Sequence, residues 1–164
     1  MPIVIELKIR EYKAFDKEQA ARLFDEFQDY LAAMDSFGLL KRPAGFGAKY
    51  LELTLKSISR GKGKMFVVLR EGSLIGLIVA IVLPKTKDPG VKHGLRGRIS
   101  ELYLDKSHRG SGVGALLMKA GERYLKQRKC KRIFIEVFTP NVGAHKFYKK
   151  FGYRDVDFEM VKNL

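Results

Sequence analysis

A glycine-rich stretch that runs directly into an amphipathic helix is the feature that most constrains this chain. It reads Arg109-Gly110-Ser111-Gly112-Val113-Gly114, and the apolar run Ala115-Leu116-Leu117-Met118 follows at once. The first turn of a helix leaves backbone N–H groups unpaired, and the helix dipole adds partial positive charge there. Because glycines place no side chain in the way, a bulky anion can reach this backbone. The stretch therefore predicts a binding site for a phosphate or pyrophosphate group.

The pattern of apolar residues on either side predicts an α/β chain that forms one domain over residues 1–164. Apolar and alternating runs predict strands over 3–9, 64–70, 74–83, 98–105, 131–138 and 153–161. Helical periodicity predicts helices over 16–34, 48–59, 110–128 and 140–152, the first of them capped by Asp16. The middle strands can pair as an antiparallel meander. The strand–turn–helix–strand unit over 98–138 predicts a right-handed crossover, which makes its two strands parallel neighbours.

The net charge and the single cysteine indicate which partners and which cellular compartment to expect. A net charge of +14 at pH 7 favours polyanionic partners, namely nucleic acid, a membrane surface or a phosphorylated cofactor. A solvated, lysine-rich surface explains the same charge equally well. The single cysteine, Cys130, cannot form an internal disulfide, which fits a reducing compartment. With no leader-like start and no apolar run long enough to span a bilayer, we expect a cytoplasmic protein that does not bind membranes.

Three kinds of glycine loop bind phosphates, and their spacings differ. The P-loop requires Gly-x-x-x-x-Gly-Lys-Ser/Thr, which is absent from the sequence. The dinucleotide fingerprint Gly-x-Gly-x-x-Ala is matched by Gly110, Gly112 and Ala115, but it should follow its strand at once. Here residues 105–109 intervene between strand and glycine, so this match is weak.

The third pattern, Arg/Gln-x-x-Gly-x-Gly/Ala, fits residues 109–114 and is the acetyl-CoA signature of the GNAT family of N-acetyltransferases. A second segment, residues 141–153, reads Asn-Val-Gly-Ala-His-Lys-Phe-Tyr-Lys-Lys-Phe-Gly-Tyr and resembles the family's Asn-x-x-Ala-x-x-Phe-Tyr-x-x-x-Gly-Phe/Tyr motif. The strand 100–105 stands where the family has its splayed central strand. The chain thus resembles the GNAT family, by its motifs over 98–153 and by element order alone over 1–97.

The resemblance implies a fold and an activity. The fold is a mixed α/β (α+β) sheet of about six to seven strands flanked by about four helices, in which splayed parallel strands bind CoA. The activity is transfer of an acetyl group from acetyl-CoA directly to a primary amine in a ternary complex. The acceptor stays open among a small amine, an antibiotic, a protein N-terminus and a lysine side chain. The acyl-chain preference is also open, and a homodimer is compatible with the family.

The resemblance also implies which residues bind the cofactor. The pyrophosphate would lie on Arg109, Gly110, Ser111, Gly112, Val113 and Gly114, although Gly112 or Gly114 can instead serve close packing of helix on sheet. The pantetheine arm would pair with the main chain of Leu102, Tyr103 and Leu104 on the splayed strand. Asn141 is expected to cap the last short helix and, by resemblance, to bond the pantetheine together with Tyr148 nearby.

Two residues are candidates for proton transfer. Tyr148 lies seven residues after Asn141 and so on the same helix face, where its phenol could protonate the leaving CoA thiolate. The alternative for Tyr148 is a core tyrosine beside Phe147 and Phe151. Glu101 matches the position of the catalytic base in several family members and could take a proton from the amine. The alternative for Glu101 is an ion pair with Arg98 or another cation.

Other charged groups carry weaker expectations. Asp25, Glu26 and Asp29 form an acidic strip on the first helix that could attract a cationic amine, or that is simply a solvated face. The basic loop 85–98 could attract an anion such as the 3′-phosphate of CoA. His93 and His108 are poor candidates for the base, and no metal-ligand spacing is present, so we expect no metal. The alternative function is a basic nucleic-acid-binding or scaffolding protein on a GNAT fold.

Overall fold

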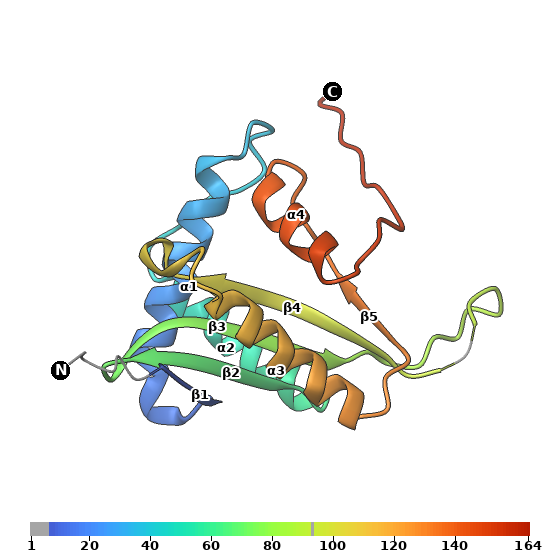
Figure 1. Cartoon of the computed structure of the whole chain (residues 1–164). Coiled ribbons are helices and arrows are strands. Elements are labelled where there is room, and N and C mark those ends of the chain that lie inside the picture. The colour runs from blue at the N-terminus through green and yellow to red at the C-terminus, as the bar shows by residue number, and fades with distance from the viewer. Residues whose placement is uncertain (1–6, 93) are drawn as a thin grey trace.

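A five-stranded mixed sheet forms the centre of the molecule (Figure 1), in a computed structural model that describes residues 7–92 and 94–164. The strands lie side by side in chain order: β1 (Leu7–Glu11), β2 (Lys64–Arg70), β3 (Ser73–Val82), β4 (Arg96–Leu104) and β5 (Arg132–Ile135). The first four strands pair antiparallel, whereas β5 pairs parallel to β4. The predicted meander, the parallel crossover and the mixed α/β class are thereby confirmed.

Four helices cover the sheet. Helices α1 (Lys17–Ala33) and α2 (Phe46–Arg60) pack on one face, and α3 (Val113–Gln127) packs on the other. Helix α4 (Val142–Lys150) follows β5, and short 3-10 turns, η1 (Ala14–Asp16) and η2 (Lys106–His108), precede α1 and α3. All four predicted helices are present, with ends that differ by a few residues.

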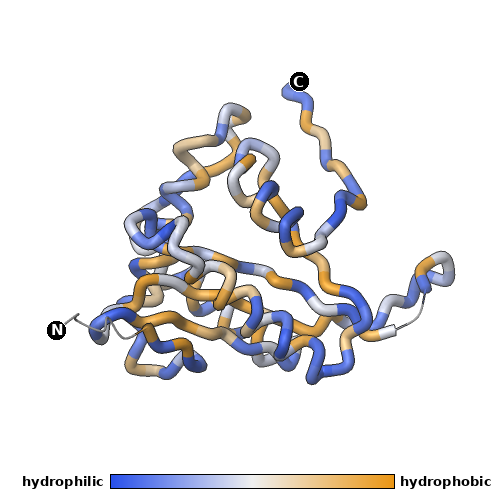
Figure 2. The backbone as a smooth tube through the Cα atoms, in the orientation of Figure 1, coloured by the Kyte–Doolittle hydropathy of each residue, from blue (hydrophilic) through white to orange (hydrophobic). Residues whose placement is uncertain are grey.

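The hydrophobic core is divided in two by the sheet. Alternate side chains of β3 point to opposite faces, so Leu77 and Val79 join the cluster under α1 and α2, whereas Ile78 and Ala80 join the cluster under α3. Most of β3 is therefore buried, and Figure 2 shows this strand and its neighbours as the most hydrophobic part of the chain. β4 contributes to both clusters, with Ile99 and Leu104 on the α3 side and Tyr103 on the other.

Two predicted strands differ from the structure. Residues 153–161 form no strand, and β5 ends at Ile135 instead of residue 138, so the described sheet has five strands and not six or seven. Alternating residues form a strand only where a neighbour completes the backbone ladder, and neither segment has such a neighbour among the described residues. The first strand begins at Leu7; its predicted start, residues 3–6, lies outside the described part of the chain.

Asp16 occupies the position before α1 but does not cap that helix with its side chain, contrary to the prediction. Its carboxylate is instead buried and accepts two hydrogen bonds from the Arg10 guanidinium at 2.7 and 2.8 Å and one from the Lys13 N–H. These donors hold the pKa of Asp16 below its usual value. A buried ion pair with β1 therefore fixes the start of α1.

None of the helices within residues 7–92 and 94–164 combines the length and the apolar character needed to cross a membrane.

Candidate functional site

β4 and the last strand, β5, separate partway along β4, and the candidate site is arranged around this gap. The two strands pair from Arg96 and Arg132 up to Ile99 and Ile135, and no further. The ladder of β4 with β3 shifts at the same point, leaving Ser100 as an extra, exposed residue. Such a bulge bends a strand and re-aims the side chains that follow it. Beyond Ser100, β4 continues to Leu104 without a paired strand on its β5 side in the part of the chain that the structure describes.

The backbone of β4 offers hydrogen-bonding groups to this gap at alternate residues. The N–H of Asp105 donates to the Ile75 carbonyl of β3 at 2.8 Å, so by alternation the main chain of Tyr103 also faces β3. The main-chain groups of Leu102 and Leu104 then face the gap. The Leu104 carbonyl already accepts a hydrogen bond from the Arg109 side chain at 2.9 Å. Of the three residues predicted to pair with pantetheine, Leu102 is thus the best placed to do so with its backbone.

The glycine turn opens α3 in the manner that an anion site requires. Gly110 and Gly112 have φ values of +77° and +84°, which side chains rarely adopt, and a Cβ on either would project into open space. Among the described residues, no acceptor bonds the N–H groups of Gly112, Val113 or Gly114 at the start of the helix. An uncovered row of N–H donors with this much room fits a pyrophosphate.

Two residues of the turn have other contacts. A Cβ on Gly114 would lie 3.6 Å from the Phe147 ring, an ordinary van der Waals contact, so the packing of α4 against α3 does not require a glycine here. The Ser111 hydroxyl donates to the His108 carbonyl at 2.6 Å and so stiffens the turn.

Arg109 points back from the turn towards α1 and β4. Its guanidinium lies 4.2 Å from the centre of the Tyr30 ring and 5.5 Å from that of Tyr103, besides its bond to Leu104. Cations are attracted to aromatic faces over these distances. Arg109 therefore ties the turn to the two elements that border the gap, and its charge remains close to the anion site.

Glu101 lies next to the bulge and is held by a residue from α2. Its carboxylate accepts a hydrogen bond from the Tyr50 hydroxyl at 2.7 Å. Burial raises the pKa of Glu101 to about 7; the Tyr50 hydrogen bond opposes this rise, and the nearby charge of Glu136 adds to it. A carboxylate whose pKa lies near neutrality can exchange protons with an amine. Arg98, the partner considered for Glu101, instead pairs with Glu136 at 2.9 Å.

Tyr148 reaches the same region from α4. Its ring contacts Phe147 edge-on at a centroid distance of 5.5 Å and Tyr153 at 6.1 Å, and it packs against the cluster on the α3 face of the sheet. Burial, and then the charge of Glu101, raises the pKa of Tyr148 to about 12. The phenol therefore stays protonated at neutral pH, and it senses the carboxylate of β4 across the gap. The aromatic packing is also what a core tyrosine would show.

Asn141 joins α4 to α1. Its side-chain oxygen accepts from the Ala144 N–H at 3.1 Å, which confirms the predicted cap, and the Tyr30 hydroxyl lies 3.4 Å from the same oxygen. No described residue accepts a hydrogen bond from its NH₂ group. This donor is thus available at the edge of the gap.

The acidic strip of α1 is largely paired. Asp25 accepts from the Gly47 N–H at 2.9 Å, Asp29 pairs with Arg42, and Glu26 pairs with Arg22 on its own helix. Part of the strip nevertheless borders a hollow of about 480 Å³ between α1 and the end of β4, lined by Glu26, Asp29, Tyr30, Tyr103, Asp105, Lys106 and Arg109. The three carboxylates of this lining exceed its two cations, Lys106 and Arg109, by one negative charge, and two tyrosine rings stand beside them.

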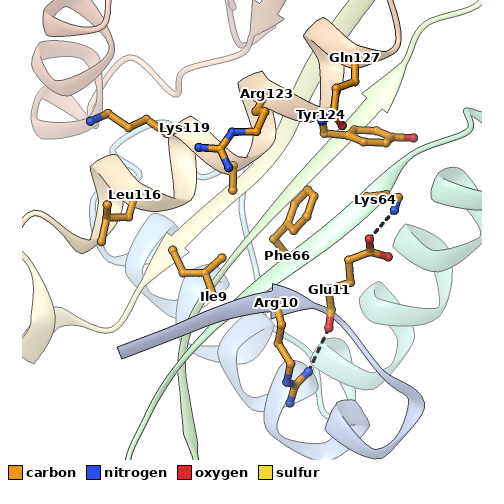
Figure 3. Close-up of a pocket in the computed structure, with 11 residues that line it drawn as sticks. Ile9, Arg10, Glu11, Lys64, Phe66, Leu116, Lys119, Arg123, Tyr124 and Gln127 are labelled. Atoms are coloured by element: carbon orange, nitrogen blue, oxygen red, sulfur yellow. Dashed lines mark hydrogen bonds and ion pairs between the residues drawn. The ribbon is translucent and has the colours of Figure 1, made fainter. Parts of the chain in front are cut away.

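A larger groove, of about 530 Å³, lies away from all of these residues (Figure 3). It runs between α3 and the first two strands, and its rim carries Arg10, Lys64, Lys119 and Arg123. None of the predicted site residues lines it, so this groove lies outside the candidate site.

The described part of the basic loop lies apart from the gap. The loop leads into the start of β4, at the opposite end of that strand from the glycine turn (Figure 1), so it is badly placed for the CoA 3′-phosphate. His108 contacts Ser107 and Asp105 in η2. His93 lies outside the described residues.

Three residues near the gap were not predicted from the sequence: Tyr50, Tyr30 and Glu136. Tyr50 bonds Glu101 although 51 positions separate them, and Tyr30 meets Asn141 over 111 positions. Nothing in the linear spacing indicates either contact. Glu136 directly follows β5, at the point where this strand separates from β4. From there its charge acts on Glu101.

Comparisons with known proteins identify the family of this chain. The model of the acetyltransferase (GNAT) family matches residues 21–153. A spermine/spermidine N(1)-acetyltransferase of Bacillus subtilis (strain 168) is 32% identical over 102 residues, which are 57% of this chain and 66% of that protein. A probable spermine N(1)-acetyltransferase of Bacillus subtilis subsp. natto is 33% identical over the same shares. The chain thus spans slightly less than two thirds of the length of these curated relatives.

Solved structures extend the likeness to the whole fold. A mutant of the BH1408 protein from Bacillus halodurans superimposes with a TM-score of 0.83 at 22% identity, over 96% of this chain and 99% of that one. The aminoglycoside N-acetyltransferase AAC(6')-Iy in complex with CoA gives a TM-score of 0.76 at 15% identity, over 100% and 98% of the two chains. At these identities the likeness concerns the fold alone. Together with the match over residues 21–153, it confirms the resemblance of the motifs: the chain belongs to the acetyltransferase (GNAT) family.

Proposed function

We propose that this chain is an acetyltransferase that transfers the acetyl group of acetyl-CoA directly to a primary amine. The observation that carries the proposal is the gap between β4 and β5, which opens beside an uncovered glycine turn and contains a carboxylate with a pKa near neutrality. The gap offers strand-like pairing to an extended arm, and the turn offers N–H donors to a pyrophosphate. Both features fit the two parts of one CoA molecule.

The residues that would bind acetyl-CoA follow from their positions. The pyrophosphate is assigned to residues 109–114. The pantetheine arm is assigned to the backbone of Leu102 and to the Asn141 NH₂ group, and Tyr103 and Leu104 follow Leu102 on the same strand. When bound, acetyl-CoA supplies a thioester whose carbonyl carbon accepts an amine and whose sulfur leaves as a thiolate.

Proton transfer is divided between Glu101 and Tyr148. Glu101 accepts the proton that the amine must lose to become a nucleophile, and the Tyr50 hydroxyl keeps its carboxylate in place. Tyr148 donates its hydroxyl proton to the departing thiolate. Burial keeps the pKa of Tyr148 raised, but the contribution from the charge of Glu101 disappears once Glu101 is protonated, so the first transfer makes Tyr148 a better acid for the second.

The acceptor is proposed to be a cationic amine. The curated relatives named above act on spermine and spermidine, and one structural neighbour is an aminoglycoside N-acetyltransferase. In this chain the hollow beside α1 carries Glu26, Asp29 and Asp105. The lining also carries Lys106 and Arg109, so its net charge is −1, which favours a cationic acceptor over an uncharged one.

The test combines acetyl-CoA titration by calorimetry with a thiol-release assay in which spermine is the acceptor. We expect saturable acetyl-CoA binding and turnover by the wild-type chain. Tyr148→Phe should bind acetyl-CoA equally well but lower kcat by about 10²-fold or more, because a general acid contributes in this range. Tyr153→Phe is the matched control, since its hydroxyl bonds Glu122 on α3 and should leave kcat unchanged.

Two results would contradict the proposal in different ways. Equal kcat values for the wild type and Tyr148→Phe would remove the tyrosine from the mechanism but leave the cofactor site intact. No acetyl-CoA binding, together with salt-sensitive binding of a short DNA duplex, would favour the nucleic-acid-binding alternative.

A further inference from the structure

Tyr30 stands where α1, the glycine turn and α4 meet, and the mechanism proposed above gives it no role. It lies three positions after Phe27, on the stripe of α1 that packs against the sheet. Phe27 stacks on Tyr103 of β4 at a ring distance of 5.3 Å. The last turns of α1 then extend past β4 on the side of α4 (Figure 1). Tyr30 is half-buried there and borders the hollow beside α1.

The ring of Tyr30 holds Arg109 without neutralising it. The Arg109 guanidinium lies 4.2 Å from the ring centre, and its Nε donates to the Leu104 carbonyl at 2.9 Å. Both carboxylates of α1 that line the same hollow pair with other arginines, Arg22 and Arg42. An aromatic face attracts a cation but carries no net charge, so it fixes the side chain and leaves the positive charge for an anion. The Tyr30 ring is therefore suited to hold Arg109 for the pyrophosphate assigned to the turn.

The hydroxyl of Tyr30 reaches the other half of the proposed cofactor site. It lies 3.4 Å from the side-chain oxygen of Asn141, and this oxygen also accepts from the Ala144 N–H at 3.1 Å. Because both donors face the oxygen, the amide has one favoured orientation, in which its NH₂ group points the opposite way. A distance of 3.4 Å is long for a hydrogen bond between oxygens, so we expect the hydroxyl to contribute less than the ring.

We propose that Tyr30 is a positioning residue that sets both halves of the acetyl-CoA site from α1. Its ring acts through Arg109 on the pyrophosphate half, and its hydroxyl acts through Asn141 on the pantetheine half. This inference rests on the proposed function, since it takes the glycine turn to bind the pyrophosphate and Asn141 to bind the arm. A tyrosine that only fills the core would not divide its effects between ring and hydroxyl in this way.

Calorimetric titration with two parts of the cofactor separates the two contacts. ADP carries a diphosphate without the arm, and S-acetyl-pantetheine carries the arm without the phosphates. Tyr30→Leu removes the ring and should raise the Kd of ADP by about three- to tenfold, because a cation–ring contact contributes in this range. Tyr30→Phe keeps the ring and should leave the Kd of ADP unchanged. Both variants lack the hydroxyl, so each should raise the Kd of S-acetyl-pantetheine by about threefold.

Tyr12→Leu and Tyr12→Phe are the matched controls. Tyr12 packs against the same buried cluster as Tyr30, but it directly follows β1, where its N–H donates to the Met65 carbonyl at 2.9 Å. The same substitutions there change the core without touching Arg109 or Asn141, so the Kd values of both ligands should equal those of the wild type. Circular dichroism checks that every variant is folded.

The possible contradictions differ for the two levels of the proposal. A folded Tyr30→Leu variant that binds ADP as tightly as the wild type would overturn the role of the ring. A Tyr30→Phe variant that weakens ADP binding as much as Tyr30→Leu does would overturn the division between ring and hydroxyl. A wild type that binds acetyl-CoA, ADP and S-acetyl-pantetheine not at all would contradict the proposed function itself, and the role of Tyr30 with it.

Discussion

At the scale of single residues, the pair of Tyr50 and Glu101 decides how the site responds to pH. The pKa of Glu101 is raised to about 7, so its carboxylate is largely protonated below that pH and ionised above it. A base acts only when ionised, so kcat/KM of the wild type should rise with pH and level off above about 7. The kcat/KM of Glu101→Gln should not show this rise, and at pH 8 it should lie about 10²-fold or more below that of the wild type. The acceptor amine titrates identically for both proteins, so the comparison isolates Glu101.

The control for this prediction is Glu136→Gln. The charge of Glu136 contributes to the raised pKa of Glu101, so its removal should shift the pH profile towards lower pH without changing its shape. Profiles of equal shape for the wild type and Glu101→Gln would exclude Glu101 as the base.

At the scale of elements, the crossing of α1 and α2 positions Tyr50 for its bond to Glu101. Gly47 is buried at this crossing, and a Cβ there would lie 2.0 Å from the Ala21 carbonyl oxygen of α1. Gly47→Ala should therefore push the helices apart and lower the free energy of unfolding by about 1–3 kcal/mol, as measured by urea denaturation. Because Tyr50 follows one helical turn later, kcat should fall as well.

Ala48→Ser is the control for this crossing, because it enlarges the adjacent, exposed position. Its unfolding free energy should stay within about 0.5 kcal/mol of the wild type. A Gly47→Ala variant as stable and as active as Ala48→Ser would show that the crossing does not position Tyr50.

The elements also show which parts of the site follow from the sequence. The glycine turn and the Asn141 cap are local, since their partners lie within a few residues, and both were predictable from spacing. The bond from Tyr50 to Glu101 depends on the packing of α2 against the sheet, which no linear pattern encodes. The segment 153–161 shows the converse: its alternation is typical of a strand, but a strand also needs a neighbour, which the described chain does not supply.

At the scale of the whole molecule, the net charge of +14 should favour the anionic cofactor. Salt shortens the range of this attraction, from about 10 Å at 0.1 M to about 3 Å at 1 M. The Kd of acetyl-CoA, measured by calorimetry, should therefore rise several-fold over this range. S-Acetyl-pantetheine lacks the phosphates and serves as the control, with a Kd or KM that changes little. Equal salt dependence of the two ligands would indicate that the phosphates do not contact the basic surface.

The division of the core by the sheet has a consequence for how such a protein can change during evolution. Helix α3 and the glycine turn belong to one side of β3, whereas α1, α2 and Tyr50 belong to the other. Apart from Tyr30, which contacts Arg109 and Asn141, substitutions under α1 and α2 can thus reshape the side proposed for the acceptor without repacking the side proposed for acetyl-CoA. A lineage that carries this fold can acquire new acceptors step by step while its donor stays the same, and a protein engineer can choose library positions by the same rule.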